Sequence, residues 1–132
     1  MILLLNTSTP VCYIAFVANV NDAKIIHEAS WKSGRELAKS LLLFIQQELE
    51  KCNYQWSDLT GLVVYKGPGS FTGLRIGITV INSLAYTYSI PVVGEGGDNW
   101  TNNGLNKLAM GKDDKIVLPE YGGEANITKP RK

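Results

Sequence analysis

The segment from Gly67 to Gly77 reads GPGSFTGLRIG and constrains the fold of this chain more than any other segment. It follows an apolar run, residues 61–65, that is typical of a strand, and precedes an apolar stretch, residues 76–88, that is typical of a helix. Glycine and proline suit a tight turn, and Ser70 or Thr72 is suited to cap the helix. The sequence therefore predicts a strand, a glycine-rich turn and a helix whose first N–H groups face the turn.

A turn of this kind can hold a phosphate, but its residues differ from those of the nucleotide-binding P-loop. That motif requires a lysine followed by serine or threonine after its last glycine, whereas here Gly73 is followed by Leu74 and Arg75. A weak nucleotide site remains a hypothesis, and its candidate residues are Thr7, Ser8, Gly67, Gly69 and Ser70. The alternative is that both turns are structural and that the hydroxyl residue only caps the helix.

The other segments up to residue 95 alternate between strand and helix patterns. Three runs rich in apolar and β-branched residues, 2–5, 11–20 and 24–30, are joined by short polar turns and predict an antiparallel meander. Residues 32–52 have helical apolar spacing, and Ser33 and Glu36 have the spacing of a capping box. Residues 90–93 add a last strand. The predicted order β-β-β-α-β-α-β is that of an α/β, RNase H-like half-domain of the actin type (ASKHA), with parallel strands continuing the meander.

Both long helices carry more apolar surface than one face of a sheet requires. In the first helix Leu37, Leu41 and Phe44 form one stripe, a second stripe lies beside it, and Leu43 points away from both. In the second helix Gly73 and Gly77 lie four residues apart. Because an interior glycine costs about 1 kcal/mol relative to alanine, this pair predicts close approach of another backbone. The excess apolar surface favours a second packing partner.

Composition excludes several classes of function. The formal net charge of +1 provides no general attraction to nucleic acid or to an anionic membrane. No apolar run approaches the roughly 20 residues of a membrane span. Cys12, Cys52 and a single histidine cannot supply a zinc site. We expect no metal site and reduced thiols in a cytoplasmic protein.

Two other functional interpretations of polar residues have little support from the sequence. Ser70 would need a positioned base to act as a nucleophile, and His27, the only histidine, is expected at the surface near a strand end. We therefore expect no catalytic residue. Acidic and basic side chains late in the chain are expected to be solvated, with any RNA contact weak or indirect; they are Asp98, Asp113 and Asp114, and Lys112, Lys115, Lys129, Arg131 and Lys132.

The motif GPGSFTGLRIG, with residues 82–85 and the strand 90–94, resembles the bacterial tRNA threonylcarbamoyladenosine biosynthesis protein family TsaB, also called YeaZ. Residues 3–9 resemble that family's first strand and turn, residues 34–43 fall at its first long helix, and residues 118–121 and 127–130 resemble its C-terminal end. The resemblance implies an RNase H-like domain over residues 1–95. Residues 96–132 are expected to be a short, mostly irregular extension that replaces a second lobe.

The resemblance also implies a function without catalysis. TsaB-like proteins support the catalytic subunit TsaD, which transfers a threonylcarbamoyl group to an adenosine of tRNA, and the ATPase TsaE joins them. Any ATP would act through these partners, since Asn6 stands where the family has an aspartate. The two long helices are expected to form the partner surface and, without a partner, a homodimer. The residues predicted on or near it are Leu37, Leu41, Phe44, Gly73, Arg75, Gly77, Ile81 and Leu84.

Two alternatives remain open from the residues themselves. One is an actin-type nucleotide-binding phosphotransferase or ATPase, and the other is a stand-alone homodimeric interaction module. Periodicity does not separate homodimer from heterodimer use of the helices, nor does it show which of their residues face the sheet.

Overall fold

The computed structural model describes residues 1–121 and has the predicted order of strands and helices. The strands β1 (Ile2–Asn6), β2 (Val11–Asn19), β3 (Asp22–Lys32), β4 (Gly61–Gly67) and β5 (Val92–Gly96) form one sheet in the order β3-β2-β1-β4-β5. β1 pairs antiparallel with β2, and β2 with β3, whereas β4 pairs parallel with β1 and with β5. The predicted RNase H-like half-domain is confirmed.

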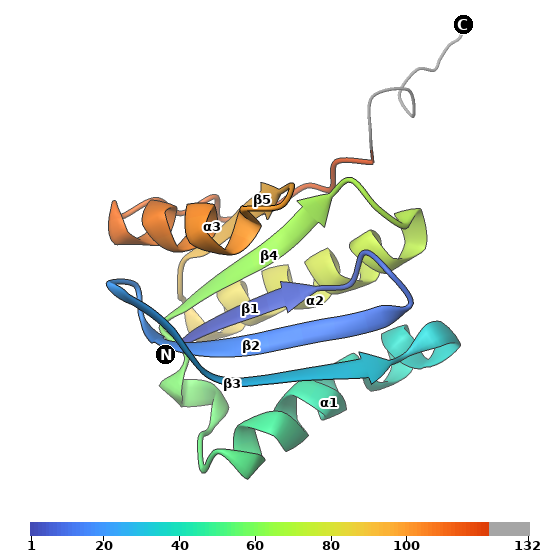
Figure 1. Cartoon of the computed structure of the whole chain (residues 1–132), viewed down its shortest axis with the longest axis horizontal. Coiled ribbons are helices and arrows are strands. Elements are labelled where there is room, and N and C mark those ends of the chain that lie inside the picture. The colour runs from blue at the N-terminus through green and yellow to red at the C-terminus, as the bar shows by residue number, and fades with distance from the viewer. Residues whose placement is uncertain (122–132) are drawn as a thin grey trace, which may run out of the picture.

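Helices cover both faces of this sheet (Figure 1). α1 (Leu37–Lys51) and α2 (Phe71–Tyr88) share one apolar cluster with the sheet, and α3 (Trp100–Ala109) shares a second cluster on the other face. Short 3-10 turns, η1 (Gly34–Glu36) and η2 (Trp56–Asp58), flank α1. Among the described residues, no helix has the length and apolar character needed to cross a bilayer.

β1 is the central strand and is buried on both of its faces. Leu3 and Leu5 belong to the cluster beneath α1 and α2, whereas Ile2 and Leu4 belong to the cluster beneath α3. Alternate side chains of a strand point to opposite faces, so a strand between two helical layers must be apolar at every position. This explains the unbroken apolar run at the start of the chain.

The start of α1 differs from the prediction of a capping box. Ser33 makes no capping hydrogen bond; its hydroxyl instead donates to the carbonyl oxygen of Pro10 at 3.3 Å, and its backbone N–H donates to the same oxygen at 3.1 Å. Ser33 is buried against the turn between β1 and β2, where this carbonyl needs a donor. The first turn is therefore the 3-10 helix η1, and α1 begins at Leu37.

The close approach predicted from Gly73 and Gly77 occurs inside the chain. A Cβ atom on Gly77 would overlap the hydroxyl oxygen of Thr7, and one on Gly73 would overlap the carbonyl oxygen of Thr7. The Thr7 hydroxyl donates to the carbonyl oxygen of Gly73 at 2.7 Å. The two glycines thus let α2 lie directly on the end of β1.

We expect Gly77→Ala to lower the free energy of unfolding by about 1–3 kcal/mol, because the added methyl group overpacks the contact with Thr7. Urea unfolding measures this change. Thr79→Ala, at an exposed position of the same helix, is the control and should change stability by less than about 0.5 kcal/mol. The double variant Gly77→Ala with Thr7→Ala should lose less than the sum of the single variants. Strict additivity would contradict the contact.

Candidate functional site

The glycine-rich turn is held by contacts from its own chain. Ser70 caps α2, since its hydroxyl oxygen accepts from the backbone N–H of Gly73 at 3.3 Å, as predicted for Ser70 or Thr72. The backbone N–H of Ser70 donates to the carbonyl oxygen of Ser8 at 2.9 Å. Asn6 orders the partner turn, because its side-chain oxygen accepts from the N–H of Ser8 at 2.9 Å. The two turns therefore brace each other.

The five candidate nucleotide-binding residues lie in or beside these turns, and most of them have a structural task. Thr7 is fully buried and bonded to α2, Ser8 is 9% exposed and lies against Gly69, and Ser70 is the helix cap. Gly67 lies beneath the backbone of Glu120, whose N–H donates to the carbonyl oxygen of Lys66 at 2.7 Å. These contacts support the structural interpretation, and nucleotide binding stays a prediction.

The residues predicted on the partner surface separate into a buried and an accessible group. Leu37, Leu41, Ile81 and Leu84 are at most 6% exposed and belong to the core. Such side chains hold the helices in place and are not free to touch a partner. Gly77 is buried as well. The accessible group has three members: Phe44 is half-buried against Trp31, Gly73 is half-buried, and Arg75 is exposed.

A groove lies between α1 and α2, and Arg75 is on its wall. This helix groove has a volume of about 340 Å³ and is lined by Ala38, Thr72, Arg75, Ile76, Thr79 and Val80. The guanidinium group of Arg75 lies 5.6 Å from the centre of the Phe71 ring. Of the lining residues only Arg75 was predicted. The groove was missed because helical spacing alone does not show which stripe faces the sheet.

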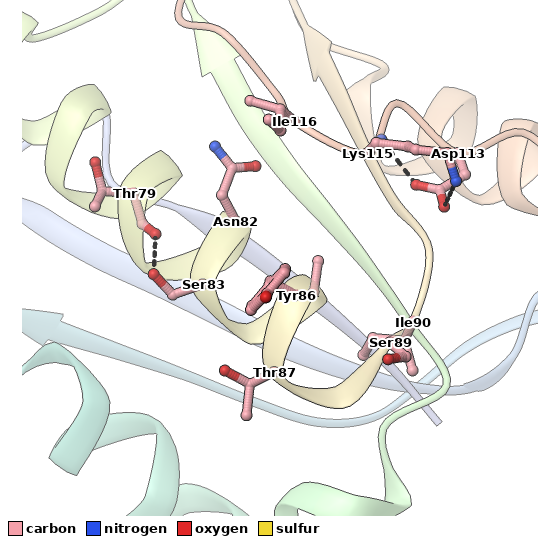
Figure 2. A pocket seen from close by; sticks show the side chains of 11 residues that line it. Thr79, Asn82, Ser83, Tyr86, Thr87, Ser89, Ile90, Asp113, Lys115 and Ile116 are labelled. Carbon is pink, nitrogen blue, oxygen red and sulfur yellow. Dashed lines mark hydrogen bonds and ion pairs between the residues drawn. The ribbon is translucent and has the colours of Figure 1, made fainter.

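A second, larger hollow of about 890 Å³ lies between the C-terminal half of α2 and residues 113–116 (Figure 2). Asn82 holds the segment in place, since its amide donates to the carbonyl oxygen of Val117 at 3.1 Å and accepts from the Val117 N–H at 2.9 Å. Tyr86 is 88% exposed at the rim. Thr79, Ser83 and Thr87 contribute hydroxyl groups to the lining of this hollow.

Asp113 and Asp114 are exposed loop residues, as expected, and their carboxylates also accept hydrogen bonds from β5. The backbone N–H of Val92 donates to the Asp113 carboxylate at 3.1 Å, and that of Gly94 donates to the Asp114 carboxylate at 2.8 Å. β5 is an edge strand, so its outward N–H groups need acceptors from outside the sheet. Burial acts to raise the pKa of Asp113, but these backbone bonds and Lys115 lower it below the ordinary value.

The expectation that His27 lies near a strand end is wrong, although its side chain is partly exposed. His27 lies within β3 and its Nε2 atom is 2.8 Å from a carboxylate oxygen of Glu48. Glu48 is only 5% exposed, and Lys51 donates to its other oxygen at 2.8 Å. Ser70 has no part in this cluster. Glu48 lies on the buried stripe of α1, so helical spacing could have indicated a buried carboxylate at this position. Its pairing with His27 of β3 depends on the tertiary fold.

The basic residues that were expected to be solvated fall into two groups. Lys112 and Lys115 are exposed within the described residues, whereas Lys129, Arg131 and Lys132 lie outside them.

The two cysteines are free, Cys12 in the core and Cys52 partly exposed.

Comparison with known proteins identifies relatives over the whole sheet. The family model described as TsaD, tRNA N6-adenosine threonylcarbamoyltransferase, matches residues 28–95, more than half of the chain. The tRNA threonylcarbamoyladenosine biosynthesis protein TsaB of Buchnera aphidicola subsp. Schizaphis graminum is 33% identical over 71% of this chain and 43% of its own length. TsaB of Escherichia coli K12 is 29% identical over 95% of this chain and 56% of its own length.

A solved structure has the same fold. YeaZ from Pseudomonas aeruginosa superimposes with a TM-score of 0.64 and 28% identity over 72% of this chain and 43% of that one. The chain thus spans about half the length of the relatives it matches.

We expect Glu48→Gln to lower the free energy of unfolding by about 1–2 kcal/mol at pH 7, because the carboxylate loses charge-assisted bonds. Burial acts to raise the pKa of Glu48, but the bonds from Lys51 and His27 outweigh it and hold the pKa below its ordinary value of 4.5. The stabilisation is therefore present above about pH 4.5 and is lost as the pH falls through the lowered folded-state pKa. Urea unfolding across pH measures this loss.

The exposed neighbour variant Glu50→Gln is the control and should change stability little at any pH. A deficit of Glu48→Gln that stays undiminished down to the lowest pH at which the chain folds would contradict the role given to this carboxylate.

Proposed function

The chain belongs to the TsaB (YeaZ) family, within the wider family of the threonylcarbamoyltransferase model, and we propose that it is a non-catalytic subunit of tRNA threonylcarbamoyladenosine synthesis. In this proposal the chain binds and supports a TsaD-like catalytic subunit. Curated tRNA N6-adenosine threonylcarbamoyltransferases, such as that of Clostridioides difficile, are 32% identical to this chain over 47% of its residues. The two subunit types would thus share a related fold.

The observation that carries the proposal is the helix groove between α1 and α2. Its walls include the apolar side chains of Ala38, Ile76 and Val80, which the core leaves accessible. Leu42 and Leu43, on the outward side of α1, are 51% and 55% exposed. Accessible apolar side chains that lie together on adjacent helices are typical of a protein interaction surface. A standard interface buries roughly 800 Å² on each partner, which two helices of 15 and 18 residues can provide.

Charge adds a requirement for the partner. Arg75 lies over the Phe71 ring at one side of the groove, so its position is defined while its N–H donors remain accessible. A guanidinium group binds a carboxylate through two parallel hydrogen bonds. The partner surface that fits is therefore an apolar helix side that carries an aspartate or glutamate opposite Arg75.

The contacts of the glycine-rich turn favour a supporting role over catalysis. The polar groups of Thr7, Ser70 and Asn6 bond to the chain itself, and Asn6 supplies a neutral amide where the family has a carboxylate. We propose that ATP is used by TsaD-like and TsaE-like partners in the cytoplasm, and that tRNA contact is indirect. In the absence of TsaD the same helix groove would join two copies of this chain.

Ala38→Arg should weaken binding to the TsaD protein of the same organism at least tenfold, about 1.4 kcal/mol, because the longer side chain fills the groove and adds charge beside Arg75. Isothermal titration calorimetry measures the affinity. Ala109→Arg, at an exposed position on α3 across the sheet, is the matched control and should bind like wild type. Failure of the wild-type chain to bind TsaD, or equal binding by both variants, would sink the proposal.

A further inference from the structure

We infer that a pocket at the C-terminal ends of α1 and α2 binds the guanidinium group of an arginine that a partner polypeptide presents. This aromatic pocket has a volume of about 380 Å³. The residues that define it are Gln46 and Glu50 of α1, Tyr54 and Trp56 of the segment that follows α1, and Tyr88 at the end of α2. None of them lines the helix groove, so the inference extends beyond the proposed function and is tested without TsaD.

The aromatic walls of the pocket are held in place by the fold. Tyr54 and Trp56 are half-buried and pack against the core cluster beneath α1 and α2. The backbone N–H of Tyr54 donates to the carbonyl oxygen of Leu49 at 2.9 Å, and Leu49 is 1% exposed. The carbonyl oxygen of Trp56 accepts from the N–H of Leu59 at 3.1 Å. Because these walls are already ordered, ligand binding costs less conformational entropy.

The orientation of the rings favours a flat ligand. The rings of Trp56 and Tyr88 are nearly parallel, at 14°, and their centres are 6.5 Å apart. Trp56 is half-buried and Tyr88 is 37% exposed, so part of each side chain is accessible. A guanidinium group is planar and stacks on aromatic faces, whereas an ammonium group is a compact, strongly hydrated point charge. Arginine is also the cation that lies more often over aromatic rings in proteins.

The charge of the pocket favours a cation. Glu50 is the only charged residue among the described residues that line it. The Gln46 amide donates to one oxygen of the Glu50 carboxylate at 3.3 Å, which helps to fix the position of this group. The adjacent basic residue, Lys51, donates to Glu48 at 2.8 Å. A carboxylate beside aromatic faces suits a guanidinium group, which stacks on the rings and forms two parallel hydrogen bonds to the carboxylate.

Two other ligands of aromatic sites fit this pocket less well. Single-strand nucleic-acid sites combine aromatic rings with positive charge, whereas the described lining residues supply no positive charge and Glu50 repels phosphate. A proline ring also packs in aromatic grooves, but it is neutral and makes no use of a carboxylate. An arginine side chain uses both the rings and the charge.

The lining residues also favour an arginine within a polypeptide over the free amino acid. Free arginine carries a carboxylate of its own, which would meet Glu50 and no cationic group among the described lining residues. Within a polypeptide this group is a neutral amide. Gln46, Glu50 and Ser57 are exposed at the pocket, so a side chain can enter from solvent while its main chain stays outside. The partner that fits is a polypeptide with an arginine at its surface.

Nitrogen-15 NMR of the full-length chain tests this inference through the indole N–H resonance of Trp56. The probe is acetyl-Gly-Arg-Gly-amide, compared with the same peptide carrying lysine or citrulline, which has the shape of arginine without its charge. We expect a saturable shift of Trp56 with the arginine peptide. The dissociation constants of the other two peptides should be at least about fivefold larger, because only the guanidinium group both stacks and pairs with a carboxylate. Trp31 and Trp100 do not line the pocket, and their resonances should not move.

Glu50→Gln should raise the dissociation constant of the arginine peptide at least about fivefold, because the neutral amide cannot form the charge-assisted pair. Glu36→Gln, at an exposed position at the other end of α1, is the matched control and should bind like wild type. Unchanged resonances of Trp31 and Trp100 in both variants show that the chain remains folded.

Several results would overturn the inference. The first is a Trp56 resonance that does not respond to the arginine peptide. The second is equal affinity for the arginine and citrulline peptides, or equal binding by Glu50→Gln and wild type, either of which would leave the charge without a role. The third is equal affinity for the lysine peptide, which would assign the pocket to any cation. The fourth is a shift of Trp56 on adding a uridine oligonucleotide, which would assign it to nucleic acid.

Discussion

The contact between Thr7 and two glycines of α2 is the constraint on which the rest of the structure depends. Thr7 ends the central strand, is fully buried, and bonds to the carbonyl oxygen of Gly73. Because Gly73 and Gly77 have no side chains, α2 rests directly on the sheet at this point. The position of α2 in turn decides where α1 packs, since these two helices contact each other. The helix groove is a consequence of that placement.

The same placement explains why the glycine-rich turn stabilises the fold and leaves its surface to other tasks. The Ser70 N–H donates to the neighbouring turn, and the Ser70 hydroxyl oxygen accepts from the first turn of α2. The carbonyl oxygen of Lys66, just before the turn, accepts from the Glu120 N–H. The accessible chemistry lies elsewhere, on the outer sides of α1 and α2. There the helix groove combines apolar walls with the exposed guanidinium group of Arg75.

Much of the fold was predictable from local pattern. The order of strands and helices along the chain, both long helices and the cap at Ser70 can be predicted from apolar spacing and turn residues. These features depend on neighbouring residues in the sequence. The binding surfaces were predicted less well. Leu41 and Ile81 satisfy the helical pattern equally well as core or as surface, and the structure buries both. The pairing of His27 with Glu48 and the bond from Val92 to Asp113 were not predicted, because the partners in each pair lie 21 residues apart in the sequence.

The sequence by itself determined the family, the order of the elements and the need for a close approach at Gly73 and Gly77. These are encoded locally, in the motif from Gly67 to Gly77 and in the spacing of apolar residues. Only the tertiary structure decided that Thr7 makes the close approach, that a buried Glu48 pairs with β3, and which side of each helix is accessible. The reason is physical: burial and pairing depend on contacts between segments far apart in the chain, and periodicity within one helix carries no information about them.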